Sequence, residues 1–183
     1  MTEWILFAVG SILLIVLSRK SLVKPGSHGF YRFFAWESML GLLMLNARFW
    51  FTRPFAWNQV IAWFLLFACL VPLAFGVHSL RTRGKPVPQR EGDPSLMAFE
   101  KTTQLVTNGI YRYIRHPLYS SLLGLTWGIF FKSVSWQSFV LAGIATFFLI
   151  RTARADEAEC IQFFGVPYRE YMKHTKMFVP LIY

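Results

Sequence analysis

Apolar runs separated by short polar segments dominate the sequence. We expect five of these runs to form membrane helices, at residues 4–18, 30–51, 55–77, 118–132 and 135–150. About 20 apolar residues cross a bilayer, so the second and third runs are long enough, the first is just long enough with its flanks, and the last two are short. A brief polar connector joins the last two runs. This pattern predicts a helical hairpin whose two ends lie on one side of the membrane.

Two polar segments flank that hairpin, a loop at residues 78–117 and a tail at residues 151–183. A loop of this length inside a compact protein is usually either functional or disordered. Both segments are expected on the same membrane face, because the hairpin begins and ends there. The sequence therefore predicts an all-α integral membrane protein, with residues 1–183 forming one membrane domain.

The composition agrees with this fold class. With 55% hydrophobic and 18% aromatic residues and a mean hydropathy of +0.41, the 183-residue chain is too apolar for an ordinary soluble domain. The net charge of +10 comes from basic residues between the apolar runs, without a continuous basic patch with interleaved aromatics, so we expect no nucleic-acid partner. If the N-terminus is outside, every Lys and Arg except Arg48, Arg53 and Lys132 falls on the inner side. The positive-inside rule thus predicts an outer N-terminus and a cytosolic C-terminus, and we expect a prokaryotic cell membrane.

Few residues outside the polar segments suggest chemistry. Cys69 and Cys160 are the two cysteines, and no CxxC or His/Cys cluster is present, so neither a disulfide framework nor a metal site is expected. Glu37 lies inside the second apolar run, where we favour a structural pairing with an Arg or a backbone group over a functional role. Pro72 is expected to kink the third run.

The stretch from Gly109 to Tyr119 links the basic loop to the apolar hairpin. Gly109 suits a turn with positive φ, and Pro117 suits the first turn of the following helix. The stretch also carries tyrosines with flat faces and a cluster of basic side chains that could hold an anionic group at a helix N-terminus: Tyr111, Tyr113, Tyr119, Arg112, Arg115 and His116. Interfacial Tyr and Arg residues that only anchor a membrane helix are the alternative.

The order of these residues resembles a family motif. Leu105-Val106, Gly109, Tyr111, Arg115-His116-Pro117 and Tyr119 meet every fixed position of L-V-x-x-G-x-Y-x-x-x-R-H-P-x-Y, the shared motif of isoprenylcysteine carboxyl methyltransferases and the related phospholipid N-methyltransferases. A second block of that family, an acidic pair followed by F-G-x-x-Y-x-x-Y and a closing Pro, is similar to Asp156-Glu157, Phe164-Gly165, Tyr168, Tyr171 and Pro180. The two blocks cover roughly the C-terminal 80 residues. The first three apolar runs match only in hydropathy.

The resemblance implies an S-adenosylmethionine pocket at the cytosolic membrane face, closed by the loop and a C-terminal helix. The lipophilic small-molecule or lipid acceptor would arrive from the bilayer, and no obligate protein partner is evident. A sulfonium with a zwitterionic amino-acid end needs aromatic walls, a cationic or N–H group for its carboxylate, and an acid for its ammonium. By analogy, the cofactor-binding residues are Thr103, Gln104, Leu105, Val106, Gly109, Tyr111, His116, Pro117, Leu118, Tyr119 and Asp156, with His116 on the carboxylate end and Asp156 on the ammonium or the ribose.

The sequence departs from the family at one position. The family places an acceptor-holding Arg four residues before the conserved acid, and here these two positions are Thr152 and Asp156. Arg151 or Arg154 could replace that Arg by a small rotation of the helix, and Glu157 could exchange roles with Asp156, which makes Arg151, Arg154 and Glu157 the candidate catalytic residues. The alternative for Arg154 and Glu157 is a surface pair at i, i+3. The acceptor stays open between a prenylcysteine-like carboxylate, a lipid amine and another small molecule.

Two other functions compete with methyl transfer. Asp156-Glu157, Cys160 and Phe164-Gly165 also resemble the D-E-x-x-C-x-x-Y-G pattern of sterol reductases, which use NADPH. The Arg115-His116-Pro117 run resembles the methyltransferase motif and favours methyl transfer over reduction. A non-catalytic membrane protein of the same fold is the third alternative.

Overall fold

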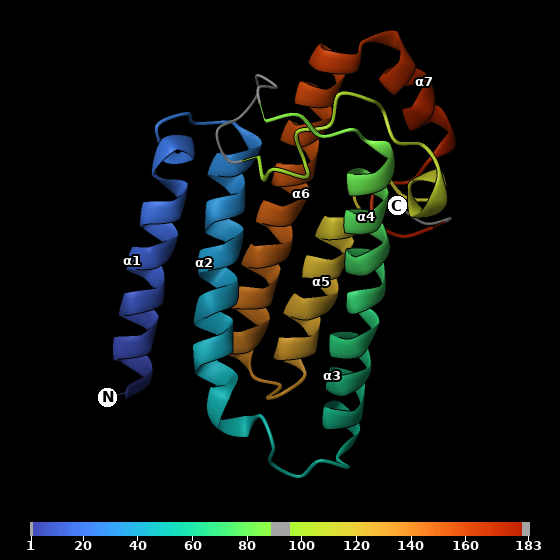
Figure 1. Ribbon diagram of the computed structural model, residues 1–183. Helices are drawn as coiled ribbons and strands as arrows, with labels where there is room; N and C mark the ends of the chain where they lie inside the picture. Colours follow the sequence, from blue (N-terminus) through green and yellow to red (C-terminus); the bar gives the residue numbers. More distant parts are fainter. Residues whose placement is uncertain (1, 89–95, 181–183) are drawn as a thin grey trace.

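The computed structural model describes residues 2–88 and 96–180, and these form a bundle of long, roughly parallel and antiparallel helices (Figure 1). No β-strand occurs in these two ranges, where pairing is limited to two isolated bridges. In chain order the elements are α1 (Thr2–Leu22), α2 (His28–Asn46), the 3-10 turn η1 (Ala47–Phe49), α3 (Trp57–Ala68), α4 (Leu70–Arg83), the 3-10 turn η2 (Gly109–Arg112), α5 (Pro117–Phe130), α6 (Trp136–Phe164) and α7 (Val166–His174).

Local chemistry explains several helix ends. The side chains of Ser27 and Ser135 accept hydrogen bonds from backbone N–H groups three residues later and cap α2 and α6. Pro117 occupies the first turn of α5, as the sequence predicts. A one-residue break at Cys69 separates α3 from α4 near the predicted kink, since Pro72 has no N–H to donate to the carbonyl of Ala68, the last residue of α3.

The described residues contain three helices that are long and apolar enough to cross a membrane. They are Glu3–Leu22, the consecutive pair α3–α4 over Trp57–Arg83, and Trp136–Phe164. The chain is therefore a membrane protein with an all-helical fold. The helices α2 and α5 are not among the three, although both lie in the bundle between the outer helices (Figure 1).

The observed bounds differ from the expected segments mainly in α6. The sequence predicts a membrane segment ending at residue 150, but the helix continues as one 29-residue element to Phe164. Residues 151–159 are rich in Ala, Arg and Glu, which favour helix as strongly as apolar residues do, so polarity alone does not end it. The helix stops at Gly165, whose φ of 67° few other residues adopt.

Helix packing places α6 at the centre of the bundle. α2 packs mainly on α6 and α1, while α5 packs on α3, α4 and α6 (Figure 1). Gly124 of α5 brings that helix so close to Cys69 that a Cβ would lie 2.9 Å from the Cβ of Cys69. Glu37 of α2 accepts a hydrogen bond from the hydroxyl of Ser11 on α1, so its structural partner is a serine and not the Arg or backbone group expected.

At the end of the bundle opposite the long loop, buried polar groups connect the helices. Lys132, 1% exposed, places its ammonium 3.4 Å from the ring centroid of Trp63 and 3.1 Å from the side-chain oxygen of Gln59. The amide of Gln59 in turn donates to the carbonyl of Lys132 at 2.9 Å. The connector between α5 and α6 is therefore anchored to α3. The other end of the bundle holds the cavity.

Candidate functional site

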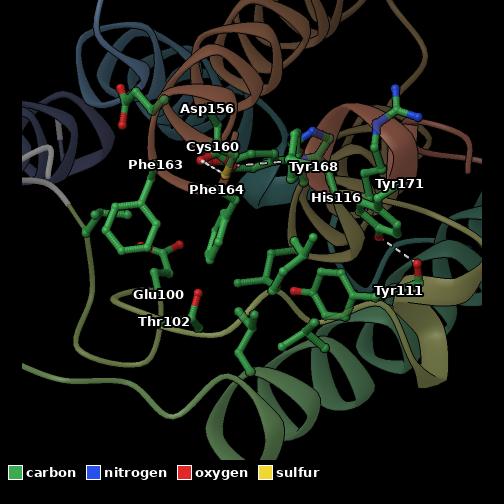
Figure 2. Close-up of a pocket in the computed structure, with 18 of the residues that line it drawn as sticks. Glu100, Thr102, Tyr111, His116, Asp156, Cys160, Phe163, Phe164, Tyr168 and Tyr171 are labelled. Atoms are coloured by element: carbon green, nitrogen blue, oxygen red, sulfur yellow. Dashed lines mark hydrogen bonds and ion pairs between the residues drawn. The ribbon is translucent and has the colours of Figure 1, made fainter. Parts of the chain in front are cut away.

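A cavity of about 510 Å³ lies where the long loop, the start of α5, the second half of α6 and α7 meet (Figure 2). Its volume is in the range typical of small-molecule sites. The lining residues are Lys24, Ser27, Leu80, Leu96, Glu100, Thr102, Leu105, Val106, Tyr111, Arg115, His116, Pro117, Leu118, Tyr119, Asp156, Glu159, Cys160, Gln162, Phe163, Phe164, Tyr168 and Tyr171. Both motif blocks contribute to this list, although they lie on either side of the hairpin in sequence.

The C-terminal segment joins the two blocks through backbone hydrogen bonds. Ile114 and Lys176 form an isolated parallel bridge. The N–H of Arg115 donates to the carbonyl of Lys176 at 2.8 Å, and that of His116 donates to the carbonyl of Met177 at 3.1 Å. Gly109 starts this stretch with a φ of 66°, which confirms the predicted turn. The tail after α7 is thus held against the residues that lead into α5.

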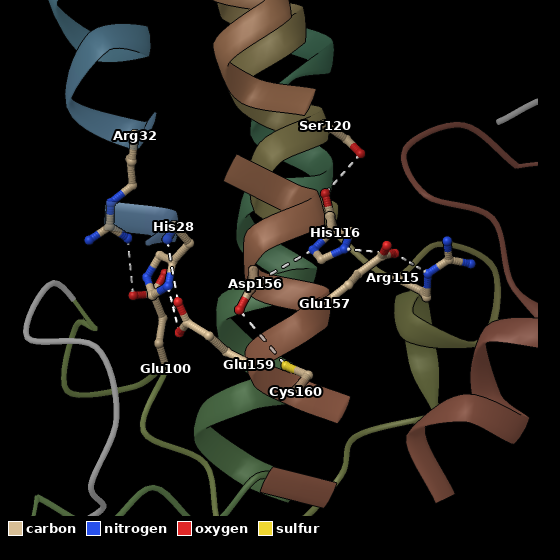
Figure 3. A network of polar contacts seen from close by, with 10 residues as sticks. All are labelled: His28, Arg32, Glu100, Arg115, His116, Ser120, Asp156, Glu157, Glu159 and Cys160. Carbon is tan, nitrogen blue, oxygen red and sulfur yellow. Dashed lines mark hydrogen bonds and ion pairs between the residues drawn. The ribbon is translucent and has the colours of Figure 1, made fainter. Parts of the chain in front are cut away.

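Four charged side chains form a network beside the cavity (Figure 3). Nδ1 of His116 lies 3.5 Å from Oδ2 of Asp156, and Nε2 lies 3.3 Å from Oε1 of Glu157. The same Oε1 accepts a hydrogen bond of 2.7 Å from Nε of Arg115. Arg115 also donates through Nη1 to the carbonyl of Thr175. The network therefore connects the start of α5, the second half of α6 and the end of α7.

His116 is buried between two carboxylates. Burial lowers the pKa of His116, but the hydrogen bonds to Asp156 and Glu157 and the charges of both acids outweigh it, so the pKa is raised above its ordinary value. A third carboxylate at this ring would meet two existing negative charges. The expected role of His116 on the carboxylate end of a cofactor therefore does not fit this geometry, although His116 does line the cavity.

The raised pKa of His116 predicts a pH dependence of stability. The protonated ring is favoured in the folded state, so its contribution is complete below about pH 6.5, the ordinary value, and is lost as the pH rises through the raised pKa. We expect the free energy of unfolding in detergent, measured at a series of pH values, to fall across that window. His116→Gln should make this fall smaller but should not abolish it, because the pKa of His28 is raised as well. Parallel profiles for the two proteins would contradict the prediction.

Aromatic side chains also line the cavity. Tyr111 lies in η2, and its carbonyl accepts a hydrogen bond of 2.6 Å from the hydroxyl of Tyr171 in α7. Phe164 stacks on Tyr168, with ring centroids 6.5 Å apart. Burial raises the pKa of Tyr111, Tyr168 and Tyr171, so all three stay neutral at physiological pH. Uncharged rings of this kind suit a flat aromatic ligand group.

Most of the predicted cofactor-binding residues come together at the cavity. Those that line it are Leu105, Val106, Tyr111, His116, Pro117, Leu118, Tyr119 and Asp156. Thr103, Gln104 and Gly109 do not line it and are exposed. Their assignment as ligand contacts stays a prediction.

None of the three predicted catalytic residues lines the cavity. Arg151 is exposed and donates to the hydroxyl of Tyr31 at 2.8 Å, with its guanidinium 4.8 Å from that ring centroid. Arg154 is exposed as well. Glu157 is not on the surface as the i, i+3 alternative requires, since it is buried against Arg115 and His116.

Several cavity residues were missed by sequence reasoning. Cys160 and Phe163 lie on the same face of α6 as Asp156, at helical spacings of four and seven, and that periodicity could have identified them. Lys24 and Ser27 precede α2, and Glu100 lies in the long loop. Nothing in the local sequence marks these three as neighbours of α6.

Comparison with known proteins agrees with the motif blocks. Residues 94–164 match the model of the phospholipid methyltransferase family. The chain is similar to a protein-S-isoprenylcysteine O-methyltransferase from Dictyostelium discoideum, with 36% identity over 87 residues that cover 43% of this chain and 34% of that protein. It is similar to a methanethiol S-methyltransferase from Pseudomonas deceptionensis, with 26% identity over 145 residues that cover 79% of this chain and 48% of that protein. A protein-S-isoprenylcysteine O-methyltransferase from Schizosaccharomyces pombe is 33% identical over 79 residues, which cover 43% and 34% of the two chains.

The chain thus spans between about a third and a half of the length of the curated relatives it matches. No solved structure matches it significantly.

Proposed function

We propose that this chain is an integral membrane methyltransferase that uses S-adenosylmethionine and acts on a lipophilic acceptor. Its residues 94–164 match the model of the phospholipid methyltransferase family. The observation that carries the proposal is the meeting of both motif blocks around one cavity, with His116 and Asp156 on the same wall. The relatives' names include O- and S-methyltransferases, which is consistent with methyl transfer to an acceptor that differs between members.

The cavity fits the cofactor in chemistry and size. Its carboxylates, Glu100, Asp156 and Glu159, suit an ammonium and ribose hydroxyls, and its tyrosine and phenylalanine rings suit an adenine. When bound, S-adenosylmethionine supplies an electrophilic methyl group on a sulfonium. Because methyl transfer is an in-line displacement, the side chains have to position the reactants and exclude water, and no metal is required. The loop and α7 would exclude water by closing the cavity.

Isothermal titration tests the proposal directly. Purified protein in detergent is expected to bind S-adenosylmethionine and its demethylated product, S-adenosylhomocysteine, and to bind NADPH weakly or not at all. Tight NADPH binding would instead support the reductase alternative. Binding of none of these ligands would support a non-catalytic protein of the same fold.

We further propose that five helical segments cross or enter the membrane, with the N-terminus outside and the cavity at the cytosolic face. The distribution of Lys and Arg supports this topology. Single cysteines placed at the exposed positions 103 and 173, in a protein lacking Cys69 and Cys160, should react with an impermeant thiol reagent from the same side. A cysteine at position 53 should react from the opposite side. Labelling of 103 and 173 from different sides would reject the topology.

Arg90, Glu91 and Asp93 of the predicted loop lie outside the described residues.

The acceptor role of Arg151 and Arg154 is also a proposal. Substitution of either by Gln is expected to lower turnover while the Kd for S-adenosylmethionine stays within about twofold, because neither side chain lines the cavity. Steady-state kinetics combined with titration separates the two effects. Unchanged turnover in both variants would remove these residues from the mechanism.

A further inference from the structure

The two ends of the cavity differ in chemistry. Figure 2 shows Glu100 and Phe163 toward one end and Tyr111 and Tyr171 toward the other. The tyrosine end is aromatic, and the charge of Arg115, which also lines the cavity, is paired with Glu157. The other end, next to the start of α2, also includes Lys24, Ser27 and Glu159. We call it the α2 end.

Glu159 is fixed at the α2 end by one residue of α2. Oε2 of Glu159 lies 2.8 Å from Nδ1 of His28, and Oε1 accepts a bond of 3.3 Å from the backbone N–H of His28. His28 is the first residue of α2, after the Ser27 cap, so the carboxylate also faces the positive end of a helix dipole. The His28 side chain is 1% exposed, whereas that of Glu159 is 32% exposed. The result is a held carboxylate that is accessible from the cavity.

A second carboxylate is held from the same face of α2. Arg32 lies one turn after His28, and its Nη1 is 3.4 Å from Oε2 of Glu100 (Figure 3). Glu100 also accepts a bond of 2.7 Å from the backbone N–H of Met97. The start of α2 therefore sets the position of the two acids that line this end. Both α2 residues lie outside the segment that matches the family model.

A binding site for an α-amino acid needs a carboxylate and a cationic group side by side, because the ammonium and the carboxylate of the ligand are bonded to one carbon. His116 is unsuited to the carboxylate, since its ring faces Asp156 and Glu157. The α2 end supplies the alternative: Lys24 lines the cavity three residues before Ser27, the cap of the helix that holds Glu159.

We propose that Glu159, positioned by His28, binds the α-ammonium group of S-adenosylmethionine and that Lys24 binds its carboxylate. The inference rests on the proposed function and assigns the orientation of the cofactor. The adenine then lies at the tyrosine end, and Asp156, between the two ends, faces the ribose hydroxyls. His28 acts as a positioning residue through Glu159 and touches no ligand itself.

Three ligands that differ only in their amino-acid and sulfonium groups test this orientation by titration. S-adenosylmethionine and S-adenosylhomocysteine both carry the amino acid, while 5′-methylthioadenosine keeps the adenosine and the thioether but lacks the amino acid. Glu159→Gln is expected to weaken the first two by about tenfold or more and to leave 5′-methylthioadenosine unchanged. Lys24→Gln should show the same selectivity. Tyr111→Leu should weaken all three.

A matched control and a second variant keep the test decisive. Glu170→Gln makes the same charge change at an exposed pair with Lys173 on α7 and should alter no affinity. His28→Gln, which retains an N–H donor, is expected to weaken only the two amino-acid ligands, by less than Glu159→Gln does. Equal losses for all three ligands in the Glu159 variant, or no loss, would overturn the inference. Failure of the unmodified protein to bind any of the three would instead reject the proposed function.

Discussion

Replacing Arg115 by Met is expected to lower the free energy of unfolding by about 3–5 kcal/mol, the cost of removing one partner of a buried ion pair. The side chains of Arg115 and Glu157 are 10% and 9% exposed, and their atoms lie 2.7 Å apart. Arg115 also donates to the carbonyls of Met172 and Thr175, so the variant loses the contacts that hold the end of α7. Because α7 contributes to the cavity, cofactor binding should be lost as well.

Chemical unfolding in detergent, with Arg169→Met as an exposed control on α7, measures this effect. The double variant Arg115→Met with Glu157→Leu should recover part of the stability, since it removes the buried charge left without its guanidinium. Wild-type stability in the Arg115 variant would show that the pair contributes nothing to holding the tail.

Asp156→Asn is expected to weaken S-adenosylmethionine, S-adenosylhomocysteine and 5′-methylthioadenosine by about tenfold or more each, because all three share the ribose that this carboxylate would bind. Asp156 lines the cavity, and Oδ2 lies 3.5 Å from Nδ1 of His116. His116→Ala should weaken the same ligands because it releases Asp156. The fold is expected to survive both changes.

Titration in detergent measures these losses, and Glu170→Gln again controls for the change in charge. Asn keeps the size of Asp, so a loss in the Asp156 variant reports the charge and not the packing. Full-strength binding of S-adenosylmethionine in both the Asp156 and His116 variants would defeat the proposed cofactor site.

Local sequence is sufficient for the helices and for the central part of the site. Long apolar runs form helices wherever they are buried in a bilayer, because the backbone has no other hydrogen-bonding partners there. The backbone of Gly109 readily adopts the positive φ of the turn, and the fixed φ of Pro117 suits the first turn of α5. The residues from Tyr111 to Tyr119 then run from the cavity wall into α5.

Tertiary packing decided the rest, because the remaining contacts join residues that are far apart in the chain. His28 and Glu159 are 131 positions apart and meet only because α2 packs along α6. Glu157 has the local pattern of a surface pair but is buried, because the C-terminal segment folds back over Arg115. The sequence by itself determined the helices, the membrane setting and the motif residues around one cavity. The charges at the α2 end of that cavity were decided by which helix faces were buried together, and no local pattern encodes that choice.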